Sequence, residues 1–167
     1  FFFKQKTAYE IRNCDWSSDV CSSDLIVLNE NLAPLLVERL NPEWVRHAAV
    51  RKILVQRMEF ELQAGDNQTN WPGLPALLDR FKASEETDIE AKAAAALITE
   101  AAAETKPIPQ PDRQLLDCLT RLRDVAFDKQ IVDLRAKMAL PELSDAERSD
   151  LWKQHEALRE AKRKPLT

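Results

Sequence analysis

Hydrophobic residues recur along most of this chain at the spacing of a helix face. Leucines at helical spacing predict a first helix over residues 31–40, and they are Leu32, Leu35, Leu36 and Leu40. Asn31 is placed to cap this helix. Pro34 falls in its first turn, where the missing N–H of a proline costs little.

A second helix is predicted to begin just after the first. Asn41 can cap it, Pro42 suits its first position, and Gly65 suits the left-handed residue that follows its end. Its apolar residues form two overlapping rows, one of Val45, Ala49, Ile53 and Phe60 and one of Trp44, His47, Leu54 and Met58. The pattern therefore predicts a helix to about residue 64 without fixing its buried face.

Two further helices are predicted before a stiff connector. The shorter, over residues 74–81, carries an apolar row at helical spacing. The longer follows Thr87, which opens a capping box with Glu90, and its many alanines allow a neighbouring helix to approach closely. Prolines at positions 107, 109 and 111 then make an extended segment, which is the predicted subdomain boundary.

Beyond the connector, the pattern predicts two helices joined by a turn. The first runs over residues 112–138, and its apolar row shifts by one position near residue 126, so its two halves are expected to face different partners. Ser144 and Glu147 form a capping box that begins a last helix over residues 145–164. These two helices predict a C-terminal helical hairpin.

Composition supports an all-α fold. The 167 residues include only two glycines, which argues against the tight turns of a multi-stranded antiparallel sheet and against a glycine-rich phosphate loop. Charged residues make up 31%, and no run of about 18 apolar residues predicts a membrane span. The net charge of −4 removes the main electrostatic reason for tight non-specific nucleic-acid binding. We expect a helical bundle over residues 26–106 and the hairpin over residues 112–167.

Residues 1–25 differ in character from the rest. They contain Cys14 and Cys21, no helical apolar repeat and no apolar core of a signal peptide. Residues 3–11 and 14–25 instead match the translation of two stretches of a short-read sequencing adapter, separated by two index-dependent residues. We therefore expect residues 1–25 to be an adapter-derived, non-native segment that is poorly ordered and has no function. We also expect the parent protein's own upstream sequence to be replaced at this junction.

Candidate catalytic or metal-binding chemistry is sparse after residue 25. The two histidines, His47 and His155, and the remaining cysteine, Cys118, lie outside helical reach of one another, so we expect no metal site and no cofactor. No nucleophile motif occurs, and the acidic pair Glu85 and Glu86 fits a solvated helix face. We expect a binding module rather than an enzyme. A lone cysteine makes no intramolecular disulfide, which is consistent with a cytoplasmic location.

Two tryptophans and a basic cluster are the candidates for contacts. Trp44 fits core packing, whereas Trp152 fits either core packing or a partner contact, since exposed tryptophans tend to mark interfaces. The cluster formed by Arg159, Lys162, Arg163 and Lys164 lies in the last helical turn, where cations interact favourably with the helix dipole. A phosphate contact is the alternative interpretation of this cluster.

The order of elements in residues 26–167 resembles the C-terminal, helicase-binding domain of bacterial DNA primase. The segments that carry the resemblance are residues 35–43, 117–123, 129–134 and 143–148, followed by Leu151 and Leu158. In that family a helical bundle precedes a hairpin that docks on the N-terminal domains of the ring-shaped, hexameric replicative helicase. The resemblance therefore implies recruitment of primer synthesis to the replication fork. It also implies that the zinc-binding and catalytic domains lie upstream of this fragment.

The expected contact residues follow from the apolar rows and from the family's use of this end of the chain. They are Leu134, Met138, Leu143, Leu151, Trp152, His155 and Leu158. Two alternatives stay open: a helical adaptor with an unrelated protein partner, and a helical nucleic-acid-binding domain, against which the net negative charge argues.

Overall fold

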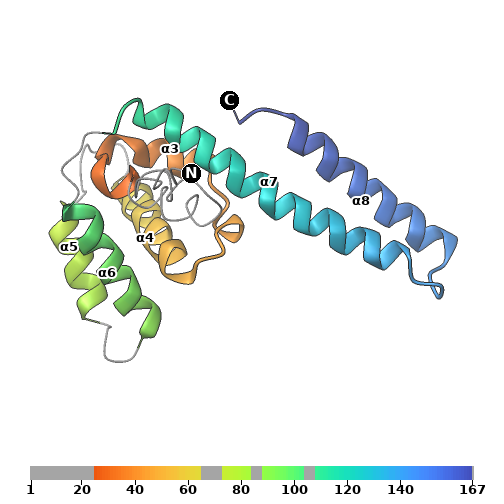
Figure 1. Cartoon of the computed structure of the whole chain (residues 1–167), viewed down its shortest axis with the longest axis horizontal. Helices are drawn as coiled ribbons and strands as arrows, with labels where there is room; N and C mark the ends of the chain where they lie inside the picture. Colours follow the sequence, from red (N-terminus) through yellow and green to blue (C-terminus); the bar gives the residue numbers. More distant parts are fainter. Residues whose placement is uncertain (1–24, 65–72, 84–87, 104–107, 167) are drawn as a thin grey trace, which may run out of the picture.

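A computed structural model describes residues 25–64, 73–83, 88–103 and 108–166 (Figure 1). Within these ranges the chain is all-α and contains no strand, as the sequence predicts. Its elements are a helical turn at residues 25–28, the 3-10 turns η1 (Glu30–Leu32) and η2 (Pro42–Trp44), and the helices α3 (Ala33–Arg39), α4 (Ala48–Ala64), α5 (Gly73–Lys82), α6 (Ile89–Ala103), α7 (Pro111–Met138) and α8 (Asp145–Arg163). The earlier helices form a bundle, and α7 and α8 project from it as a hairpin (Figure 1).

Helix α4 lies between two apolar clusters, which explains its overlapping apolar rows. On one side, Val50 and Leu54 pack with residues of α3 and α7. On the other side, Ala49 and Ile53 pack with residues of α5 and α6, whose buried alanines allow a close approach. Because α4 is buried on both sides, it has no single apolar stripe. The sequence predicts this helix and its end correctly, but no single buried face exists to be found.

The start of α4 differs from the prediction. Asn41 accepts a backbone hydrogen bond as expected, but it caps only the short turn η2. Val45 is then extended and fully buried, so the chain leaves the helix to place this side chain in the core. Arg51 Nε donates to the Val45 carbonyl at 2.9 Å, and His47 Nδ1 accepts from the Val50 N–H at 3.4 Å at the start of α4. His47 therefore has the capping role that Asn41 was predicted to have.

Of the two other predicted caps, one differs from the structure and one lies outside the described residues. Asn31 lies inside η1, because the chain is already helical before α3 begins, so the prediction that it caps the first helix is wrong. Thr87 lies outside the described residues. At the start of α6, Asp88 Oδ1 accepts from the N–H groups of Glu90 and Ala91, so Asp88 caps this helix.

Helix α7 belongs to both the bundle and the hairpin. Its first half supplies buried side chains to the cluster that includes α3, and they are Leu115, Cys118, Leu119 and Leu122. Near its middle, Phe127 packs edge-on against Trp44, with ring centroids 6.1 Å apart. Its second half buries Ile131 and Leu134 along α8. The shift in the apolar row thus marks where α7 changes partners. The predicted boundary between residues 106 and 112 does not separate two independently packed parts.

Only one described position bears on the packing of residues 1–25, the segment that matches an adapter translation. Residues 1–24 lie outside the described residues. Gly65, predicted to follow the end of α4 in a left-handed conformation, also lies outside them. Leu25, the last residue of the adapter match, is fully buried with Ile26 in the cluster around α3. Leu25 is therefore the one described residue of this segment, and it packs in the core. A leucine here extends the apolar helical turn at residues 25–28, and its side chain fills the core whatever its origin.

Candidate functional site on the C-terminal hairpin

The hairpin consists of the second half of α7, the turn at residues 139–144, and α8 (Figure 1). Ser144 Oγ accepts from the Glu147 N–H at 3.3 Å, and the Glu147 carboxylate accepts from the Ser144 N–H at 2.9 Å. This is the capping box that the sequence predicts, and it satisfies N–H groups at the start of α8. Hydrogen bonds from the Ser144 hydroxyl and backbone lower the pKa of Glu147 below its ordinary value.

Arg123 holds the other end of α8 on the bundle. Its side chain is almost fully buried, and its guanidinium donates to the carbonyls of Lys164 at 2.7 Å and Lys162 at 3.2 Å while pairing with Asp124 at 2.9 Å. Carbonyls at a helix C-terminus lack intrahelical partners, so Arg123 caps α8 from the neighbouring helix. Leu166 then packs against the bundle. The base of the hairpin is therefore fixed, and the turn at residues 139–144 is its far end.

A polar cluster joins the two helices further out. His155 is only 2% exposed, and its Nε2 accepts from Arg135 Nε at 3.2 Å. A neutral imidazole that accepts at Nε2 carries its proton on Nδ1, which then donates to the Glu156 carboxylate at 3.2 Å. The Trp152 ring stacks on the His155 ring with centroids 5.5 Å apart. This arrangement holds Trp152 at the surface, where it is 56% exposed.

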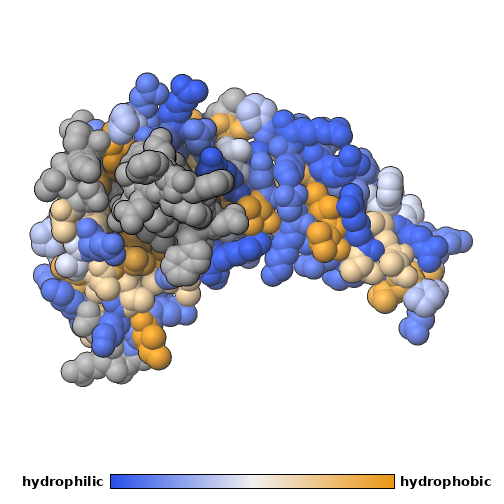
Figure 2. All heavy atoms as spheres, in the orientation of Figure 1, coloured by the Kyte–Doolittle hydropathy of each residue, from blue (hydrophilic) through white to orange (hydrophobic). Residues whose placement is uncertain are grey.

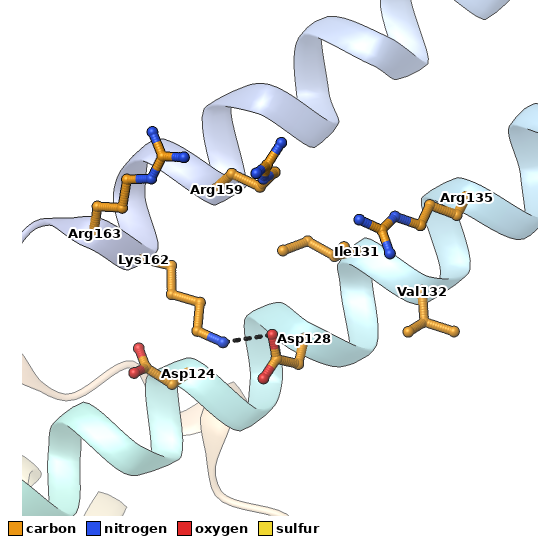
Figure 3. A pocket seen from close by; sticks show the side chains of 8 residues that line it. All are labelled: Asp124, Asp128, Ile131, Val132, Arg135, Arg159, Lys162 and Arg163. Carbon is orange, nitrogen blue, oxygen red and sulfur yellow. Dashed lines mark hydrogen bonds and ion pairs between the residues drawn. The ribbon is translucent and has the colours of Figure 1, made fainter.

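A groove of about 500 Å³ runs between α7 and α8 beside this cluster (Figure 3). Its apolar part is formed by Ile131 and Val132, and Val132 is 61% exposed. Its polar lining residues are Asp124, Asp128, Arg135, Arg159, Lys162 and Arg163. The Lys162 ammonium reaches across from α8 to the Asp128 carboxylate at 2.6 Å, as the dashed line in Figure 3 shows.

Positive charge is in excess along this groove. Both of its carboxylates are engaged inside the protein, Asp128 with Lys162 and Asp124 with Arg123. Arg159 pairs with Glu156 at 3.2 Å. Burial raises the pKa of Glu156, but the contacts of Glu156 with Arg159 and His155 lower it further, so the pKa lies below its ordinary value. Neither Arg135 nor Arg163 forms an ion pair with a carboxylate among the described residues. The groove therefore offers guanidinium groups to an external anion.

The structure places the seven predicted contact residues in three settings. Two of them, Leu134 and His155, are buried between the helices of the hairpin. Four are half-buried, namely Met138, Leu143, Leu151 and Leu158. Trp152 is the one that is mainly exposed. A partner contact stays a prediction for all seven. In this placement Leu134 and His155 stabilise the hairpin, and Trp152 is open to solvent over more than half of its surface.

Sequence reasoning missed Arg123 and Arg135. Arg123 follows Leu119 by one helical turn in the apolar row of α7, and a polar residue in such a row indicates a buried, hydrogen-bonded group. That signal was present in the sequence. Arg135 gave no such signal, because its role depends on His155, which lies 20 residues later on another helix.

A second hollow, of about 450 Å³, lies where α4, α5 and α6 meet. Lys52 bridges Asp88 and Glu90 there, and the hydrogen bond to Asp88 raises the pKa of Lys52 above its ordinary value. The same hydrogen bond lowers the pKa of Asp88. Lys52 thus joins α4 to the start of α6, which Asp88 caps, so these contacts stabilise the bundle.

The described residues contain no group of three or more His, Cys, Asp or Glu side chains arranged to hold a metal ion. None of the helices in the described part of the chain has both the length and the apolar character needed to cross a membrane. No family model, curated protein or solved structure matches the chain.

Proposed function

We propose that this chain is a docking domain that binds a protein partner through its C-terminal hairpin. The observation that carries the proposal is the exposed Trp152 on a hairpin that projects from the bundle (Figure 1). Figure 2 shows a largely hydrophilic hairpin surface with apolar atoms at its far end, where Leu140 is 54% exposed. Large apolar side chains exposed away from a core are typical of interaction sites.

The setting of Trp152 supports a binding role for it. The indole rests on His155, which Arg135 holds through a hydrogen bond from the other helix. An aromatic side chain that is already ordered before binding loses little conformational entropy when a partner covers it. Tryptophan is also among the residues that contribute most to protein interfaces. These features favour Trp152 as the central contact of the hairpin.

The proposed partner is the N-terminal region of a hexameric replicative helicase, as the resemblance to the primase domain implies. Docking would place whatever is covalently joined upstream of the domain near the replication fork. That raises its effective concentration there without any new catalytic group. Through such recruitment the parent protein would start primers where the helicase opens the duplex.

The test is a fluorescence-anisotropy titration of the labelled chain with a cognate hexameric helicase. We expect saturable binding that is lost when the N-terminal domain of the helicase is deleted. Trp152→Ala should weaken binding by about tenfold or more, as truncation of a central interface tryptophan does. Leu62→Ala is the matched control, because Leu62 is also an exposed apolar residue but lies on α4.

Three results would overturn parts of the proposal. No binding at tens of micromolar by a folded chain would remove the helicase as partner and leave a helical adaptor with an unrelated one. Loss of the helical circular dichroism signal in Trp152→Ala would show that Trp152 is needed for folding. Equal weakening by Trp152→Ala and Leu62→Ala would remove the hairpin as the docking element.

A further inference from the structure

One face of the hairpin combines the groove with Trp152. On α8, the residues at positions i, i+7 and i+11 along one helix edge are Trp152, Arg159 and Arg163. On α7, Val132 and Arg135 line the groove, and Arg135 contacts Trp152 through His155. We call this surface the groove face, and it consists of Ile131, Val132, Arg135, Trp152, Arg159 and Arg163.

The arginines of the groove face form a local positive surface that is open to carboxylates of a partner. The chain carries a net charge of −4, yet the groove is lined by four cations and two carboxylates. Arg135 and Arg163 have no carboxylate partner among the described residues, and the exposed pair of Arg159 with Glu156 is of the kind that contributes little to stability. Guanidinium groups bind carboxylates through two parallel hydrogen bonds. The groove face can therefore exchange or add carboxylate partners at low cost.

The remaining lining residues favour a protein over a nucleic acid. Val132 and Trp152 offer apolar contact area beside the cations, which suits apolar side chains of a partner. Asp124 and Asp128 also line the groove and interrupt its run of cations, so it offers no continuous positive surface to a phosphate backbone. Isolated carboxylates on a helix can meet the arginines without meeting these aspartates.

We propose that the groove face binds an acidic, amphipathic helical segment of a protein partner. Its carboxylates pair with Arg135, Arg159 and Arg163, and its apolar side chains cover Val132 and Trp152. This is the helix-in-groove mode of recognition, with charge selecting the partner. The inference rests on the proposed docking role of the hairpin, but it does not depend on which protein supplies the helix.

The test uses the whole chain and synthetic probes in fluorescence anisotropy. The first probe is a labelled helical peptide of about 20 residues with Glu and Leu on one face; the second has Lys in place of Glu. The third is a labelled oligo-dT of about 20 nucleotides. We expect saturable binding of the Glu–Leu peptide, at least about tenfold tighter than the Lys–Leu peptide, and weaker in about 500 mM salt.

Charge reversal locates the site. The double variant Arg159→Glu/Arg163→Glu should weaken binding of the Glu–Leu peptide by about tenfold or more. Arg113→Glu is the matched control, because Arg113 is an exposed arginine in the first turns of α7, far from the groove. It should change the affinity by less than about twofold. If circular dichroism shows that the double reversal unfolds the chain, Arg159→Gln/Arg163→Gln replaces it.

Several outcomes would overturn the inference. One is that Arg113→Glu weakens peptide binding as much as the double variant does. Another is that the Glu–Leu peptide shows no saturable binding. A third is that oligo-dT binds more tightly than the Glu–Leu peptide and that this binding is lost in the double variant. The last outcome would assign the face to nucleic acid. Helicase binding that is lost in Trp152→Ala but unchanged in the double variant would leave the docking proposal intact and remove only this inference. Peptide binding that depends on Arg159 and Arg163, without helicase binding, would support this inference and remove only the helicase as the partner.

Discussion

Replacement of Arg123 by methionine is expected to release the C-terminal end of α8 from the bundle. Methionine has a similar length and apolar stem but no donor groups. The change removes the hydrogen bonds to the carbonyls of Lys164 and Lys162, at 2.7 and 3.2 Å, and the ion pair with Asp124. Nothing else among the described residues donates to these two carbonyls across the hairpin.

The expected loss of stability is about 3 kcal/mol. A hydrogen bond from a charged donor contributes about 1.5 to 3 kcal/mol, and Arg123 makes two to carbonyls. The lower end applies to each, because the end of α8 can fray and expose its carbonyls to water. Asp124 adds little, since its side chain is about one-third exposed and regains water when the arginine is removed.

Urea unfolding followed by circular dichroism measures the total loss, and hydrogen exchange locates it. We expect faster exchange at the C-terminal end of α8, with exchange in α4 changed much less. Arg163→Met is the matched control: it also removes an arginine near the end of α8, but this side chain is exposed and forms no described ion pair. Its effect should stay within about 0.5 kcal/mol.

Equal losses in the two variants would refute the capping argument. So would a loss below about 0.5 kcal/mol in Arg123→Met, because it would mean that water replaces the guanidinium without cost. A uniform increase in exchange over α4, α7 and α8 would show that Arg123 stabilises the bundle core and not the helix end.

Two further predictions concern helix caps. Ser144→Ala should cost about 1 kcal/mol through loss of the capping box with Glu147, seen as a lower urea midpoint, and an unchanged midpoint would contradict it. Hydrogen bonds with Lys52 and the backbone lower the pKa of Asp88 in the folded chain. The ionised Asp88 carboxylate therefore stabilises the fold fully above the pKa that Asp88 has in the unfolded chain, and this contribution is lost as pH falls through the pKa that it has in the folded chain. Since asparagine still caps, the stability difference between the parent chain and Asp88→Asn should shrink below about pH 4 in urea unfolding at a series of pH values, and a constant difference would oppose this reasoning.

Local sequence signals predicted the helices and the hairpin because caps and apolar rows act within a few residues. The Ser144 capping box and the shift of the apolar row in α7 are two such signals. The extended Val45 could not be predicted in this way, because it depends on a core position that α3 and α7 create together. Leu25 is similar: its match to an adapter translation gives no sign that the core accepts its side chain.

The candidate site was only partly predictable for a related reason. Trp152 stood out because a large apolar residue on a hydrophilic helix is unusual. The contacts that support it join residues far apart in sequence, such as Arg135 with His155 and Lys162 with Asp128. Helix periodicity gives the face of each residue but not the register between two helices, so these pairs require the three-dimensional structure.

The continuity of α7 has a mechanical consequence. Its sequence contains no glycine, and its only proline is at the first position, so no hinge separates the bundle from the hairpin. From Leu122, the last of its side chains in the bundle cluster, to Met138 the helix extends about 24 Å. A load applied at the turn is therefore transmitted to the bundle along a stiff beam. A partner bound near the turn is therefore held at a fixed distance and orientation relative to the bundle.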